Sequence, residues 1–173
     1  MTDTVKSLII HQFTASLDTL NYCIETCPDS EWQEDHKDAP FSQVVFHTLF
    51  YADFYLGRDS IPFKEQPFHI RHKDIFRDYE EMEDKIPEHL YEKQFCLDYL
   101  AHCKGKLKAT IEAETAETLT GESGIDFRKI SRAELYVYNL RHIQHHAAQL
   151  GLRIQMVTGK EMPWFSGAKP APK

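Results

Sequence analysis

Long amphipathic stretches constrain the fold of this chain more than any other feature. In the first of them, apolar residues recur three or four positions apart: Ile9, Phe13, Leu17, Leu20 and Ile24. This spacing keeps them on one face of a helix, where they can pack against a core. The same period predicts four long helices, over residues 3–26, 40–57, 88–114 and 131–159.

The composition agrees with a helical domain. Glycine and proline together number 15 of 173 residues, too few for an all-β chain with a turn every 8 to 12 residues. The 42% hydrophobic content is enough for one core. We therefore predict an all-α fold, a four-helix bundle with long connections, formed by residues 1–160 and followed by a tail, 161–173, that is partly disordered.

The second helix, 40–57, is apolar on nearly all sides. Such a helix lies in the centre of a bundle or packs against a second subunit, so we expect a homodimer, with a central helix in a monomer as the alternative. The connections at 58–73 and 115–129 are expected to be loops, with a short helix over 74–85. Ser131 and Glu134 form a capping-box pattern that begins the last helix.

Charge and hydropathy exclude several classes of partner. The net charge is −7 and basic residues are interspersed with acidic ones, which argues against a nucleic-acid binder. No run of 18 apolar residues predicts a membrane span, and the polar N-terminal segment does not resemble a signal peptide. We expect a cytoplasmic protein. Its four cysteines are expected to be reduced, although Cys23 and Cys27 have the spacing of two thiolate ligands on one helix.

Three histidines near the C-terminus are the most informative residues. His142 and His146 are four apart, so both imidazoles can face one point on the same side of a helix. His142 and His145, three apart, form the alternative pair. We favour His142 and His146 because they continue the stripe that includes Gln149 and Arg153.

His47 is the candidate for a third ligand. It lies in the most apolar helix, where an imidazole without a partner loses its solvation. A core histidine with an ordinary hydrogen bond is the alternative. Three imidazoles on one divalent ion leave a fourth position for water or substrate, and zinc and nickel both suit such ligands.

Other side chains are candidates for roles around this site. Asp53 and Gln149 follow His47 and His146 and are predicted to support the ligands or contact the substrate, with a purely structural role as the alternative. Tyr51, Tyr55 and Tyr138 either line a cleft beside the metal or belong to the core. The remaining histidines are expected on the surface or in loops: His11, His36, His69, His72, His89 and His102.

Two segments resemble the DinB-like (YfiT-like) superfamily of metal-dependent four-helix bundle proteins. They are Phe41-Ser-Gln-Val-Val-Phe-His47 and Leu140-Arg-His-Ile-Gln-His-His-Ala-Ala-Gln-Leu150. The resemblance implies that His47, His142 and His146 bind a divalent metal. Some members are thiol-dependent S-transferases that use a low-molecular-weight thiol such as bacillithiol or mycothiol, and others are isomerases.

Three functions follow as hypotheses. The first is a thiol-dependent S-transferase that acts on small electrophiles through the three-histidine metal site. The second is a metal-dependent hydrolase in which bound water is the nucleophile and Asp53 the candidate base. The third is a non-catalytic metal-binding or interaction protein. Sequence alone names neither the substrate nor the metal, and it assigns no catalytic residue.

Overall fold

The computed structural model describes residues 2–34, 39–57, 63–76, 91–125 and 128–167, and every regular element in them is a helix. In chain order these are α1 (Thr2–Thr26), α2 (Asp29–Trp32), α3 (Phe41–Leu56), the 3-10 turn η1 (Phe63–Glu65), α4 (Pro67–Arg71), α5 (Lys73–Phe76), α6 (Lys93–Ala113), α7 (Ala116–Thr120) and α8 (Arg132–Thr158). The four longest match the four predicted helices to within a few residues.

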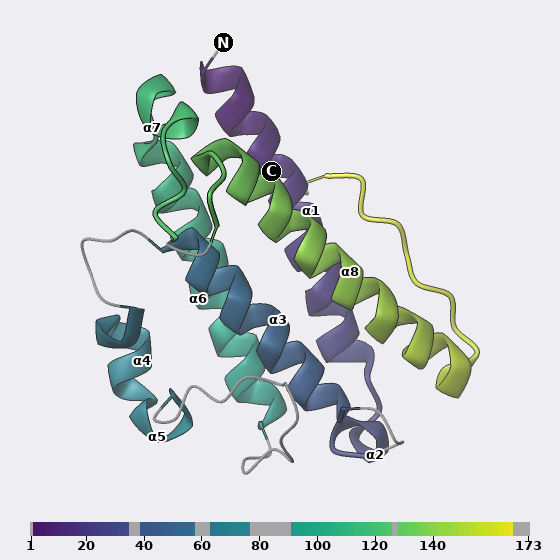
Figure 1. Ribbon diagram of the computed structural model, residues 1–173. Coiled ribbons are helices and arrows are strands. Elements are labelled where there is room, and N and C mark those ends of the chain that lie inside the picture. Colours follow the sequence, from purple (N-terminus) through teal and green to yellow (C-terminus); the bar gives the residue numbers. More distant parts are fainter. Residues whose placement is uncertain (1, 35–38, 58–62, 77–90, 126–127, 168–173) are drawn as a thin grey trace, which may run out of the picture.

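The long helices form a four-helix bundle. α1 and α3 each pack against both α6 and α8, so α1 and α3 occupy opposite corners. Figure 1 shows α1 and α8 running in one direction and α3 and α6 in the other. The all-α prediction is confirmed. Among the helices of the described residues, none combines the length and apolar character that crossing a bilayer requires.

The sequence signals at the two ends of α8 act as expected. The Ser131 side chain accepts a hydrogen bond from the backbone N–H of Glu134, which caps the first turn. Gly159 ends the helix with a φ of 69°, in the left-handed region that glycine adopts without steric cost. Local chemistry therefore fixes the length of the helix that carries two of the candidate ligands.

The segment between α3 and α6 differs from the prediction. A loop was expected over residues 58–73, but η1 and α4 form in its described part and α5 begins at its end. Together the three elements cover the outer face of α3. The rings of Phe50 and Phe63 lie 5.1 Å apart, and those of Phe46 and Phe76 lie 5.9 Å apart. The apolar side chains around α3 are thus buried or half-buried within one chain. The apolar character of this helix therefore no longer argues for a homodimer, which stays a prediction.

Some predictions fall outside the described residues. The helix expected over 74–85 is described only through Phe76, where α5 ends. The end of the tail, 168–173, is not described, although residues 160–167 are and contain no helix. The described connection at 115–129 includes the short helix α7, which the sequence analysis did not predict.

The cysteines are all free and buried, as expected for reduced structural thiols. Cys23 donates a weak hydrogen bond from Sγ to the carbonyl of Ala147, 3.5 Å away. Burial raises the pKa of Cys23 and of Cys27 to about 12, so neither thiol is ionised near neutral pH. In this protonated form, the pair does not offer the two thiolate ligands that its spacing allowed.

Candidate metal centre

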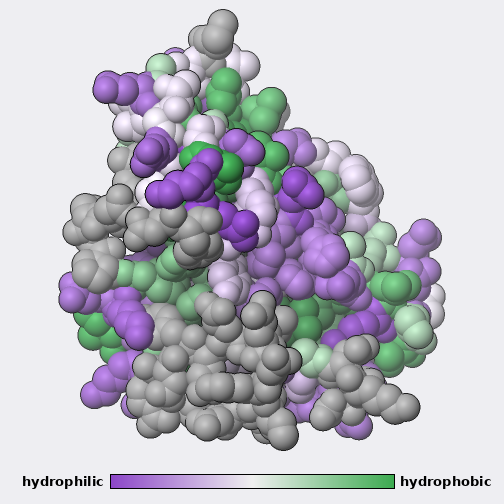
Figure 2. All heavy atoms as spheres, in the orientation of Figure 1, coloured by the Kyte–Doolittle hydropathy of each residue, from purple (hydrophilic) through white to green (hydrophobic). Residues whose placement is uncertain are grey.

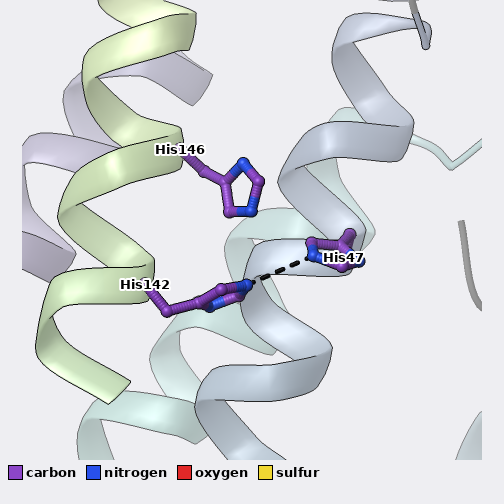
Figure 3. Close-up of side chains that lie close together, drawn as sticks. All are labelled: His47, His142 and His146. Atoms are coloured by element: carbon purple, nitrogen blue, oxygen red, sulfur yellow. Dashed lines mark hydrogen bonds between the residues drawn. The ribbon is translucent and has the colours of Figure 1, made fainter. Parts of the chain in front are cut away.

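Three histidines from two helices converge on one point. His47 extends from α3, and His142 and His146 extend from successive turns of α8 toward it (Figure 3). One nitrogen from each ring can be chosen so that all three lie within 4.8 Å of one another. The structure therefore brings together the three residues that spacing selected in the sequence.

The hydrogen bonds of the three rings orient their nitrogens. His142 Nε2 lies 3.2 Å from His47 Nε2. His146 Nδ1 lies 2.9 Å from Gln149 Oε1, and since an amide oxygen only accepts, Nδ1 carries the proton. The lone pair of His146 is then on Nε2. Gln149 thus holds the ring in the tautomer that a metal ligand needs, and its role in supporting a bound metal stays a prediction.

The donor set fits a divalent metal. Two nitrogens bound to one tetrahedral ion at 2.0–2.1 Å would be about 3.3 Å apart, close to the 3.2 Å between His142 Nε2 and His47 Nε2. His142 Nδ1 is buried without a hydrogen-bond partner. Nε2 is therefore the nitrogen of His142 that faces another histidine, His47.

The surroundings keep these imidazoles neutral. Burial, reinforced by the neighbouring histidines, lowers the pKa of His142 to about 3 and that of His47 to about 4. The pKa of His146 is also lowered, chiefly by burial. A neutral imidazole keeps the lone pair that binds metal, so the three rings are ready as ligands at neutral pH.

The alternative pair, His142 with His145, does not form. His145 is exposed on α8 and is not part of the converging group. Tyr51 instead lies against the site, with its ring 4.8 Å from that of His47 and 5.6 Å from that of His142, both edge-on. Figure 2 shows hydrophilic side chains along the middle of α8, between hydrophobic areas toward its ends.

A second group of possible ligands lies deeper in the bundle and contains Asp53, His69 and His102. Asp53 was expected beside the three-histidine site, but it faces away from it and is fully buried. Its carboxylate accepts hydrogen bonds from His69 Nε2 at 2.7 Å and Tyr99 Oη at 3.0 Å. His102 Nε2 lies 3.5 Å from the same carboxylate.

The prediction for His69 was wrong, because this residue is buried in α4 rather than exposed in a loop. His102 is partly buried on α6, whereas His11 is exposed and His72 is half-buried. His36 and His89 lie outside the described residues. The fold of segment 63–76 decides the position of His69, and no local spacing in the sequence signals it.

The second group already contains a cation. Lys106 Nζ lies 2.5 Å from Asp53 Oδ1 and 2.8 Å from Gln66 Oε1. Burial alone would raise the pKa of Asp53, but His102, His69 and Lys106 lower it below its ordinary value. A metal ion would have to displace the ammonium of Lys106 and the proton of His69. The three-histidine group is therefore the better candidate for a metal centre.

Comparison with known families gives a match over most of the chain. The family model of the DinB superfamily matches residues 12–150, a range that includes His47, His142 and His146. The chain belongs to the DinB superfamily. The searches of curated proteins and of solved structures found no match. For this DinB superfamily member, the geometry of its own residues carries the functional argument.

Proposed function

We propose that this DinB superfamily protein is a divalent-metal-dependent enzyme, and specifically a thiol-dependent S-transferase that acts on small electrophiles. One observation carries the proposal: three neutral imidazoles converge at a partly exposed point, and the group contains no carboxylate. Such a set holds a metal with open coordination positions, as catalytic sites do, rather than closing its coordination sphere. Zinc and nickel both fit these donors.

A bound metal would lower the pKa of a thiol, so that the thiolate is present at neutral pH. The thiol proton would pass to solvent, and the thiolate would then attack the electrophilic carbon, so that a C–S bond forms as the leaving group departs with its bonding electrons. Gln149 keeps His146 in its ligand tautomer. Tyr51 covers one side of the histidines and limits the access of water.

The position of Asp53 favours a thiol over water as the nucleophile. A hydrolase needs a general base within hydrogen-bond reach of the attacking water. Asp53 was the candidate, but it is fully buried and held by Lys106, His69 and Tyr99. The hydrolase reading thereby loses the base that the sequence had offered it.

The first experiment measures the metal content of the protein purified without a histidine tag. About one equivalent of zinc or nickel is expected, with loss of the metal in His142→Ala. His145→Ala is the matched control, because this neighbouring histidine is exposed and outside the group. Absence of metal in the wild type, even after incubation with excess ion, would contradict both enzyme readings and favour a non-catalytic protein.

The metal-loaded protein is then assayed with bacillithiol and a chromogenic aryl halide. Thiol-dependent release of halide that disappears in His142→Ala supports the S-transferase. Hydrolysis of an activated ester without any thiol, lost in the same variant, would favour the hydrolase instead. Metal binding without either reaction would leave the non-catalytic reading.

A further inference from the structure

A series of aromatic rings leads from the metal centre to an arginine. The rings of His142 and Tyr51 lie 5.6 Å apart, those of Tyr51 and Tyr55 also 5.6 Å, and those of Tyr55 and Tyr138 5.4 Å. Tyr138 lies one helical turn before His142 on α8. Tyr55 is buried in the core, the alternative given for these tyrosines, whereas Tyr51 and Tyr138 are half-buried. Together the three rings form a continuous wall that begins at the histidines.

Arg128 lies at the far end of this wall. Its guanidinium carbon is 4.4 Å from the centre of the Tyr138 ring, and Nη2 donates a 2.6 Å hydrogen bond to Tyr138 Oη. Its interaction with Tyr55 raises the pKa of Arg128 further, so the side chain is always charged. Two phenols therefore hold a permanent cation in a defined orientation.

A cavity of about 490 Å³ adjoins Arg128. It lies between the connection after α7 and the first turn of α8, and its lining includes Gly121, Ser123, Arg128 and Ser131. Arg128 is thus shared by the tyrosine wall and by a cavity large enough for a small molecule.

We propose that Arg128 binds the carboxylate of the small molecule whose reacting atom lies at the metal centre. The inference rests on the proposed function. A planar guanidinium matches a carboxylate with two parallel hydrogen bonds, and the half-buried rings of Tyr51 and Tyr138 contact the apolar part of the molecule between its ends. One helical turn, about 5.4 Å along the axis, separates Tyr138 from His142, so a short chain can reach both ends.

The test uses cobalt(II)-loaded protein and two thiols that differ only at one end, mercaptohexanoate and mercaptohexanol. Binding is followed by the thiolate-to-cobalt absorption band. The wild type is expected to bind the carboxylate about tenfold more tightly than the alcohol, since a hydrogen bond to a charged group contributes about 1.5 kcal/mol or more. Arg128→Gln should abolish this preference and leave the binding of mercaptohexanol unchanged.

Lys160→Gln is the control, because it removes one positive charge from an exposed position that does not line the cavity. It should retain the preference, and Arg128→Lys should retain part of it. Equal affinity for the two thiols in the wild type, or an undiminished preference in Arg128→Gln, would overturn the proposal. Thermal melting checks that Arg128→Gln is folded.

A second measurement separates this proposal from the proposed function. Calorimetry on the metal-free protein compares phenylpropionate with phenylpropanol, in the wild type and in Arg128→Gln. A preference for the carboxylate that only the wild type shows supports the anion site, whether or not a cobalt band forms. Absence of the cobalt band would contradict the metal-dependent enzyme but not the anion site. No preference in the metal-free wild type, together with none on cobalt, refutes the role of Arg128.

Discussion

The two histidine-containing groups in this bundle differ in what surrounds their imidazoles. At His47, His142 and His146 the nearest partners are other neutral rings and one amide, Gln149. At Asp53, His69 and His102 a buried carboxylate is matched by Lys106 and by hydrogen-bond donors. Both groups offer ligand atoms within 4.8 Å of one another. Proximity of ligand atoms therefore does not by itself distinguish the better candidate for a metal site. The distinguishing feature is that the lone pairs of the three histidines face no competing cation such as Lys106.

The largest expected difference between the two groups is in zinc affinity, when one histidine is removed from each. His47→Gln should weaken zinc binding by more than about 100-fold, because loss of a direct ligand exceeds the 10–100-fold effect of a supporting residue. His69→Gln should leave zinc affinity unchanged. The affinities are measured by competition with a chromogenic chelator. Zinc lost in His69→Gln and retained in His47→Gln would assign the metal to the buried acidic group.

Folding stability should show the reverse order. Asp53→Asn leaves the partly buried Lys106 without its charge partner and should lower the free energy of unfolding by about 3 kcal/mol. His47→Leu, measured in the metal-free protein, should change it by less than about 1 kcal/mol, since a neutral ring is replaced by an apolar side chain. Urea denaturation measures both. Equal losses in the two variants would remove the distinction between a structural and a functional group.

Gln149→Ala tests how the three-histidine group is supported. Without the acceptor for Nδ1, His146 no longer favours the tautomer with its lone pair on Nε2. Zinc affinity should fall by about tenfold, the low end for a supporting residue, because Gln149 is exposed. Gln155→Ala, at another exposed position of α8, is the control. An unchanged affinity in Gln149→Ala would show that packing alone orients the ring.

The two groups should affect folding stability in different pH ranges, the three histidines at higher pH than the group around Asp53. The pKa values of His47 and His142 are about 4 and 3 in the folded protein against 6.5 for an ordinary histidine. The unfolded chain therefore binds more protons between pH 6.5 and 4, so stability falls as the pH is lowered. A loss of at least about 1 kcal/mol is expected in the metal-free protein, or about 3 °C in Tm.

The lowered pKa of Asp53 acts at more acidic pH. Its contribution is present above the ordinary value of 3.8 and is lost as the pH falls below it. Thermal melts from pH 8 to 3 measure both ranges. His142→Leu should flatten the upper range and leave the lower one unchanged. An unaltered profile in this variant would mean that the histidines do not titrate as their burial indicates.

The sequence by itself determined the helices and the pairing of His142 with His146. Both depend on the geometry of a helix, in which residues four apart lie on one face whatever the rest of the chain does. The same geometry separates Asp53 from His47, against the prediction that placed them together: six residues turn a helix by about 600°, so Asp53 points about 120° away from His47.

Only the tertiary structure decided which groups meet across helices. His47 reaches α8, and Lys106 reaches Asp53, because α3 packs between α8 and α6. His69 joins the acidic group because the segment 63–76 folds over α3, a contact that no spacing encodes. Arg128, in the connection before α8, contacts Tyr138 on α8, and no local spacing encodes this contact either. Local periodicity fixes which face of its own helix a side chain occupies. The burial of apolar surface over the whole chain decides which other helix packs against that face.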